Sequence, residues 1–265
     1  MMDDSFRAFE HDGWQRAAAH YADTFGALTT ETVGPLLDAA GVGRGTRLVD
    51  VATGPGYAAA AAAAVGADVV AIDFSSSMIA AARRRYAHVD FREGDAEALP
   101  LSDRSVDAVV MNFGLLHLGR PDTALAEACR VLVAGGRAAF TVWATPDQAV
   151  GFGMVLHAIE AHGRMDVPLP PGPPFFRFSD SSEFARSLAA AGFIDPVVRT
   201  VPITWRVASG EDLLNAFLRG AVRTAALLRA QSPAALDAIR QTLTDSVGGG
   251  CDLPMPAVLA SATKP

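Results

Sequence analysis

Two aspartates stand near the ends of short apolar segments, with a glycine turn between them. Asp50 lies in the apolar run 48–51, the turn that follows holds Gly54 and Gly56, and Asp73 closes the next apolar run. Both glycines allow a positive φ and leave no Cβ in the way of a ligand. A carboxylate at the end of the second strand, about 20 residues on, takes ribose hydroxyls, whereas Asp50 would repel a pyrophosphate and attract a cation. These residues predict a ligand with a ribose and a positive charge.

A third group of polar and aromatic residues follows the apolar run 106–111. Asn112 and Phe113 come directly after it, and His117 follows a few residues later. An imidazole with an ordinary pKa near 6.5 can accept a proton from a phenol, a hydroxyl or a ring carbon. His117 is therefore a candidate general base. The alternative is that it only packs against its loop or forms a hydrogen bond with it.

These residues need a sheet that brings the ends of several strands to one edge. Strand-like and helix-like segments alternate between residues 46 and 143, which is typical of an α/β protein with a parallel sheet. Ser75 is the expected N-cap of one helix, and Pro121 stands in the first turn of another. The expected strands are 46–50, 68–72, 89–92, 106–111 and 138–143, and the helices between them are 57–65, 75–86 and 121–132.

Four ordered segments, 49–56, 72–78, 94–97 and 130–137, together resemble the class I S-adenosylmethionine-dependent methyltransferases. The resemblance covers roughly residues 40 to 145. Within the family, the sequence is most similar to the small-molecule branch that includes enzymes like the quinone C-methyltransferases. One departure is Ala52, where many relatives have a third glycine. Alanine is small, so we expect only a slightly tighter turn.

The resemblance implies a Rossmann-like sheet of seven strands in the order 3-2-1-4-5-7-6, with the last strand antiparallel. It also implies that Asp95 accepts from the adenine amino group, that the Ala96 amide meets a ring nitrogen, and that Met78 stacks on adenine. Tyr21, on an N-terminal helical segment across the pocket, would bond the methionine part or face the acceptor, so it joins His117 as a catalytic candidate. The expected cofactor-binding residues are Tyr21, Asp50, Ala52, Gly54, Gly56, Asp73, Phe74, Met78, Asp95, Ala96, Asn112, Phe113 and His117.

The remaining segments predict a helical cap on a single domain of residues 1–265. We expect an N-terminal helical lid at 1–40, a cofactor-binding core at 41–145, and cap insertions at 147–178 and 209–247. The insertions contain helices at 150–162, 210–229 and 233–246 with broad apolar faces. A sixth strand begins at 193 and runs to 201 or 205, Gly248 to Gly250 form a flexible joint, and 255–262 form the last strand. The apolar cap favours a small, apolar acceptor, although part of it would equally suit a subunit interface in a homo-oligomer.

Composition excludes several other classes of protein. The net charge of −7 disfavours nucleic acid, and an acidic start with no long apolar run predicts neither a signal peptide nor a membrane span, so we expect a cytoplasmic protein. Cys129 and Cys251 are expected to be reduced thiols, and they indicate no metal site. Lys264 is the only lysine, which excludes a P-loop or a Schiff-base lysine in the body of the chain.

The leading hypothesis is therefore S-adenosylmethionine-dependent methylation of a small molecule, on carbon or oxygen. A base is not essential, because holding donor and acceptor collinear and close can supply most of the acceleration. A nicotinamide-dependent oxidoreductase is the rival, disfavoured by the missing third glycine and by the absence of a Tyr-x-x-x-Lys pair. A protein that binds the cofactor without transferring its methyl group is the third reading.

Overall fold

A sheet of seven strands forms the centre of the molecule in the computed structural model, which describes residues 4–265. Of the acidic start of the chain, residues 1–3 lie outside the described part. Most positions of the central strands are buried, as expected for parallel strands covered on both faces. The parallel strands are β1 (Arg47–Val51), β2 (Asp68–Asp73), β3 (Asp90–Glu93), β4 (Val106–Asn112) and β5 (Leu132–Trp143).

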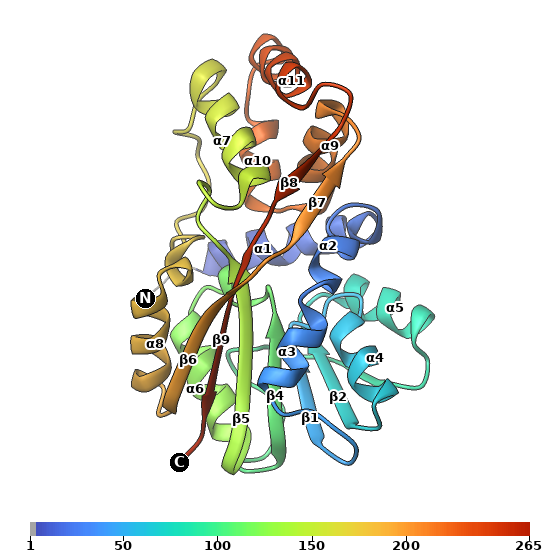
Figure 1. Ribbon diagram of the computed structural model, residues 1–265, viewed down its shortest axis with the longest axis vertical. Coiled ribbons are helices and arrows are strands. Elements are labelled where there is room, and N and C mark those ends of the chain that lie inside the picture. The colour runs from blue at the N-terminus through green and yellow to red at the C-terminus, as the bar shows by residue number, and fades with distance from the viewer. Residues whose placement is uncertain (1–3) are drawn as a thin grey trace.

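Two further strands complete the sheet on the β5 side. β9 (Ala257–Thr263) runs antiparallel between β5 and β6 (Ile194–Val201), so the order is β3-β2-β1-β4-β5-β9-β6 (Figure 1). The predicted α/β class, the predicted strand order and the antiparallel last strand are confirmed.

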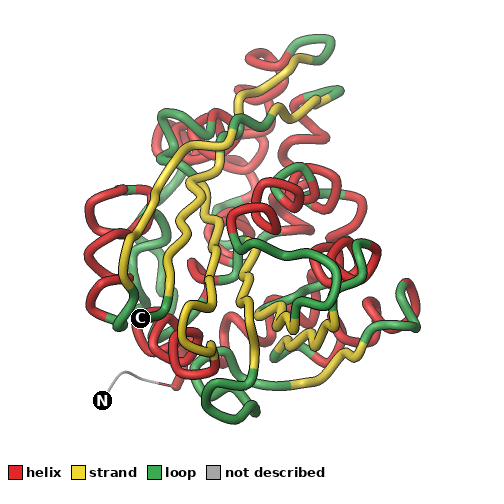
Figure 2. Tube along the Cα trace, turned by 60° about the horizontal axis from the view of Figure 1, so that its bottom comes forward, coloured by secondary structure: helices red, strands yellow, loops and turns green. Residues whose placement is uncertain are grey.

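Helices pack against this twisted sheet (Figure 2). Ser75 caps α5 as predicted, because its hydroxyl accepts from the Met78 backbone N–H at 3.2 Å. Pro121 occupies the first turn of α6, where its missing N–H costs nothing. The helices that pack against the sheet are α3 (Val33–Ala39), α4 (Tyr57–Ala64), α5 (Ser76–Arg85), α6 (Pro121–Val131) and α8 (Ser181–Ala190).

A cap of helices stands beyond the carboxyl edge of the sheet, in the upper part of Figure 1. α11 packs against both α7 and α9, and a two-stranded ribbon of β7 and β8 joins the cap to β6 and β9. The cap elements are α7 (Val150–His162), β7 (Thr204–Val207), α9 (Gly210–Gly220), α10 (Arg223–Arg229), α11 (Pro233–Val247) and β8 (Cys251–Pro254).

The structure corrects one expectation for the cap and adds detail to two other segments. The helix expected at 210–229 ends at Gly220 and restarts at Arg223, because Ala221 is extended. The sixth strand ends at Val201, the shorter of the two predicted ends, since Pro202 offers no N–H to a ladder. The chain after the glycine run forms β8, which pairs with β7 and which the sequence analysis did not predict.

The N-terminal segment crosses the molecule between the sheet and the cap (Figure 1). It consists of α1 (Asp4–Ala17), the short 3₁₀ helix η1 (Tyr21–Asp23) and α2 (Gly26–Thr30). Two more 3₁₀ turns, η2 (Leu115–His117) and η3 (Arg177–Ser179), follow β4 and precede α8. Among residues 4–265, no helix combines the length and apolar character needed to cross a bilayer.

Candidate active site

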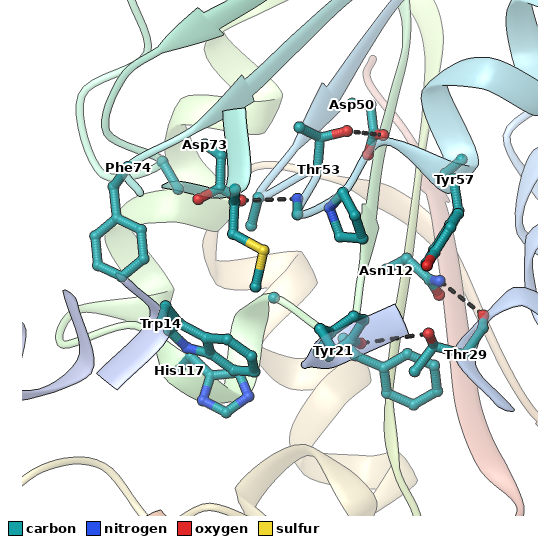
Figure 3. A pocket seen from close by; sticks show the side chains of 18 of the residues that line it. Trp14, Tyr21, Thr29, Asp50, Thr53, Tyr57, Asp73, Phe74, Asn112 and His117 are labelled. Atoms are coloured by element: carbon teal, nitrogen blue, oxygen red, sulfur yellow. Dashed lines mark hydrogen bonds between the residues drawn. The ribbon is translucent and has the colours of Figure 1, made fainter. Parts of the chain in front are cut away.

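A pocket opens at the carboxyl ends of β1, β2 and β4, with the N-terminal segment closing one side (Figure 3). Parallel strands leave a crevice at this edge, where the order of strands reverses direction. The pocket encloses about 830 Å³ of empty space, including its open mouth. Of the predicted residues, it is lined by Tyr21, Asp50, Ala52, Gly54, Asp73, Phe74, Met78, Asp95, Ala96, Asn112, Phe113 and His117.

The turn after β1 has an unusual backbone at its first small residue. Ala52 has φ +53° and Gly54 has φ +54°, so an alanine occupies a conformation that favours glycine. Room for its methyl group comes from Gly114, since a Cβ at Gly114 would lie 2.6 Å from the Ala52 Cβ. The missing third glycine of the turn is therefore offset by a glycine after β4.

Gly56 is the predicted site residue that does not line the pocket. It precedes α4 with φ +87°, and a Cβ there would lie 2.7 Å from the Phe91 ring. Gly56 therefore serves the packing of α4 against β3, and a direct contact with a ligand does not follow from its position.

Asp50 is almost fully buried at the end of β1, and one of its oxygens lacks a partner. Its Oδ2 accepts from the Thr53 hydroxyl at 2.6 Å and from the Ala59 N–H at 2.9 Å. Its Oδ1 is buried without a hydrogen bond among the described residues. Burial raises the pKa of Asp50 to about 7. A buried carboxylate oxygen without a donor costs free energy, so this atom is suited to a ligand that donates a hydrogen bond or carries positive charge.

Asp73 holds the glycine turn and the start of α5 together. Its Oδ2 accepts from the Gly54 N–H at 2.8 Å, and its Oδ1 accepts from the Ser75 N–H at 2.9 Å. Burial raises the pKa of Asp73 to about 6, although these two hydrogen bonds oppose the rise. A carboxylate keeps further lone pairs beyond these bonds, which leaves Asp73 able to accept from a hydroxyl in the pocket.

Asp95 lines the pocket from the loop after β3. Its Oδ1 accepts from the Glu97 N–H at 2.9 Å, and its Oδ2 lies 2.8 Å from Arg7 on α1. The sequence did not indicate Arg7, because an exposed arginine on an N-terminal helix carries no signal for a partner far along the chain.

Asn112 connects the end of β4 to the N-terminal segment. Its Nδ2 donates to the Thr29 carbonyl at 3.0 Å, while its Oδ1 accepts from the hydroxyls of Thr32 and Thr141. The amide is thus engaged on both sides within the protein. Its geometry favours a supporting role in the pocket wall over the direct contact with a methionyl group that the sequence suggested.

Tyr21 faces the same pocket from η1. Its hydroxyl lies 3.3 Å from the Thr29 hydroxyl, to which it donates, and burial raises its pKa to about 12. The phenol therefore stays protonated near neutral pH, so Tyr21 is equipped to donate a hydrogen bond and is a poor base.

His117 is held by an ion-paired network that joins three distant segments. Its Nδ1 lies 3.0 Å from the Glu10 Oε2 on α1, and the Glu10 Oε1 accepts from the Arg223 Nε at 2.6 Å at the start of α10. Arg223 also donates to the carbonyls of Leu116 and Pro173. Because Glu10 is fully buried, it fixes both the ring of His117 and the position of the cap.

The same network sets the protonation of its members. Burial lowers the pKa of His117, and the charge of Glu10 only partly opposes this shift. Burial by itself would raise the pKa of Glu10, but the charges and hydrogen bonds of His117 and Arg223 lower it below its ordinary value. Near neutral pH the arrangement is therefore a glutamate carboxylate that accepts from a neutral imidazole at Nδ1, with Nε2 left as the basic nitrogen.

A second hollow adjoins the pocket on the cap side and is walled by aromatic rings. Trp14, Tyr21, Phe113 and His117 line both spaces. The Trp14 ring meets His117 edge to face with centroids 4.7 Å apart (Figure 3). The other aromatic walls are Phe25, Trp143, Phe152 and Phe175, and the α9–α10 joint closes the space. The predicted apolar lid is thus largely aromatic.

Several of these residues escaped the sequence analysis. Glu10 carried one usable signal, since it falls four residues from both Phe6 and Trp14 and so puts a carboxylate in the apolar stripe of α1. Arg223 and Phe175 carried none, because their importance arises only when α10 and the loop before η3 fold over the sheet.

Residues 49–140 match the model of a family described as a methyltransferase domain. The match covers the glycine turn, the three aspartates at the strand ends and β4. Together with the strand order, this match confirms the resemblance to the class I S-adenosylmethionine-dependent methyltransferases that the four motifs predicted.

Curated relatives share part of this sequence. The chain is 46% identical over 102 residues to the demethylmenaquinone methyltransferase of Renibacterium salmoninarum, a match that covers 38% of this chain and 43% of that protein. It is 36% identical over 158 residues to the ubiquinone/menaquinone biosynthesis C-methyltransferase of Rubrivivax gelatinosus, covering 56% of this chain and 63% of the relative. The chain thus spans about half the length of these relatives.

A solved structure shares the fold at low sequence identity. Phosphoethanolamine N-methyltransferase 2 of Haemonchus contortus, in complex with phosphomonomethylethanolamine and S-adenosylhomocysteine, superposes with a TM-score of 0.54 at 19% identity. The superposition covers 88% of this chain and 52% of that one.

Proposed function

We propose that this chain transfers a methyl group from S-adenosylmethionine to a small aromatic acceptor. The observation that carries the proposal is an acidic pocket at the strand ends that continues into an aromatic hollow, with His117 at the boundary between them. The unpartnered oxygen of Asp50 and the oxygens of Asp73 suit a ligand with a positive charge and hydroxyl groups.

Different residues of the pocket would contact different parts of the proposed cofactor. Asp73 would accept from the ribose hydroxyls, Asp95 and Ala96 would face the adenine edge, and Met78 and Phe74 would flank its ring. Asp50 would attract the charged methionine part. When bound, S-adenosylmethionine supplies a methyl group on a positively charged sulfur.

The aromatic hollow is suited to a flat acceptor ring. Rings of Trp14, Phe113 and Phe152 can pack against the faces and edges of such a molecule, which favours an aromatic compound over an aliphatic one. The names of the curated relatives point to a reduced quinone methylated on carbon. The match to the demethylmenaquinone methyltransferase covers less than half of this chain. The proposed acceptor is therefore inferred mainly from the aromatic walls of the hollow.

His117 would accept the acceptor's proton. Its lowered pKa keeps the imidazole neutral near pH 7, and Glu10 occupies Nδ1, so Nε2 can take a proton from a ring hydroxyl. Loss of that proton increases the electron density of the ring and its nucleophilicity. Glu10 then stabilises the imidazolium, while Tyr21 stays a neutral donor. The aromatic walls hold the ring and exclude water.

The first test is calorimetric titration with S-adenosylmethionine, S-adenosylhomocysteine and NADH side by side. We expect micromolar binding of the first two and none of NADH, and binding of NADH alone would restore the rival oxidoreductase. The second test incubates the protein with S-adenosylmethionine and a reduced naphthoquinone, and follows S-adenosylhomocysteine and the methylated ring by mass spectrometry. Cofactor binding without methyl transfer to any aromatic acceptor would favour the reading of a non-methylating protein.

A further inference from the structure

A third hollow lies where α1 crosses the joint between α9 and α10, and its rim is strongly basic. Arg16 and His20 come from α1 and the turn after it, Arg219 from the end of α9, and Arg229 from the end of α10. The hollow encloses about 550 Å³ of empty space. Its wall includes Gly13, whose Cβ would lie 2.3 Å from a Val222 methyl, so the two segments are in close contact here.

The three guanidinium charges are not neutralised by the protein. No carboxylate of the described residues lies within ion-pair distance of Arg16, Arg219 or Arg229. Arg219 donates to the Nδ1 of His20 at 2.8 Å, and Arg229 donates to the Leu218 carbonyl. These neutral acceptors leave the positive charge in place.

Several other arginines of this chain have a carboxylate partner; Arg130, for example, pairs with Glu127 and Asp103. The basic hollow is thus a positive region on a protein whose net charge is −7. At the basic hollow, burial and the charge of Arg16 lower the pKa of Arg229, which means that the like charges repel one another. Such a cluster is stabilised by an anion.

We propose that this hollow binds an oxyanion of the phosphate class. A guanidinium presents paired N–H donors that match phosphate oxygens, and three of them surround one space here. Because the arginines come from α1, α9 and α10, a bound oxyanion links the N-terminal segment to the cap.

The position of the hollow gives this link a consequence for the neighbouring site. Ala221 and Val222 line both the basic hollow and the aromatic hollow. An oxyanion that draws α1 toward α9 and α10 therefore tightens the wall of the aromatic hollow. Binding of an oxyanion at this hollow can be measured whether or not the protein transfers a methyl group.

The test compares two sources of the same chemistry. Inorganic pyrophosphate is titrated calorimetrically at low ionic strength, and cosedimentation is measured with vesicles of phosphatidylglycerol and phosphatidylcholine against phosphatidylcholine alone. Binding of pyrophosphate supports a dissolved ligand, and binding to the phosphatidylglycerol vesicles alone supports a lipid headgroup. Both should weaken as salt rises.

The double variant Arg16→Gln/Arg229→Gln should raise the dissociation constant at least about tenfold. The matched control is Arg84→Gln/Arg199→Gln, which removes two exposed arginines that lie outside the basic hollow and should bind like the wild type. Circular dichroism checks the fold, and the single variant Arg16→Gln provides a second, milder measurement. Binding of neither probe by the wild type, or equal binding by the double variant and the wild type, overturns the proposal.

Discussion

Replacing Glu10 by glutamine tests whether the buried network positions a base. Glu10→Gln keeps the size of the side chain and removes the charge that His117 and Arg223 share. In the wild type that charge raises the pKa of His117 against the effect of burial. Without it the pKa of His117 falls further, and the amide no longer stabilises the imidazolium that forms when the ring accepts a proton.

The expected losses follow from the burial of the network. A positioned general base contributes roughly 10²- to 10⁴-fold to a rate, and His117 keeps its ring in the variant, so we expect kcat to fall about 10- to 100-fold with KM nearly unchanged. Arg223 would be left without its carboxylate while only 16% of its side chain is exposed. Removing one partner of a buried pair costs about 3 kcal/mol when a hydrogen bond survives, which corresponds to roughly 6–12 °C in Tm.

The assay is the pH profile of kcat with saturating cofactor. Activity needs neutral His117, so it is lost as pH falls through the pKa of that ring. Since the variant has a lower pKa, its acid limb should move to lower pH although its maximum rate is smaller. Glu127→Gln is the matched control, because Glu127 is a partly buried partner of Arg130 away from the pocket, and its profile should keep its position. An unchanged kcat, or an acid limb that moves to higher pH, refutes the positioning role of Glu10.

Three further predictions concern Asp73, Asp50 and the glycine turn. Asp73→Ala should weaken S-adenosylmethionine binding by about 10- to 100-fold, since a hydrogen bond to a charged group contributes roughly 1.5–3 kcal/mol; unchanged affinity by calorimetry would remove Asp73 from the ribose site. Affinity for S-adenosylmethionine should rise between about pH 5.5 and pH 8 as Asp50, with a pKa raised to about 7, loses its proton. A flat or falling affinity over that range would contradict the role of Asp50. Gly56→Ala should cost about 1–3 kcal/mol in urea unfolding, because its Cβ meets Phe91 at a positive φ, and an unshifted urea midpoint would show that the helix start adapts.

The sheet and the lining of the pocket could be predicted from local sequence. Residues 48–56 combine an apolar strand with a turn of small residues, and the alternation of segments fixes a parallel sheet, so Asp50, Gly54 and Asp73 were placed at one edge. These features depend on neighbours in the chain. Met78 was placed in the site by the family resemblance, which implies that it stacks on adenine.

The network around His117 could not be predicted in the same way. Glu10 and Arg223 are 213 positions apart, and nothing in either neighbourhood specifies the other. Asn112 shows the same limit, because its hydrogen-bond partners Thr29, Thr32 and Thr141 come from segments far from it in the sequence. The break after Gly220 was missed because apolar periodicity continues across it.

The position of β9 has a consequence for how the molecule is made on the ribosome. β6 pairs only with β9, and β9 also covers the outer edge of β5. As the chain emerges, residues 47–143 can already assemble β3, β2, β1, β4 and β5 with the glycine turn in place. β5 and β6 stay without their shared neighbour until residues 257–263 are synthesised, and the ribbon of β7 and β8 that carries the cap is anchored only then. The glycine turn and the five parallel strands can therefore assemble before the cap has been synthesised, whereas the ribbon that carries the cap is anchored to the sheet only once β9 has formed.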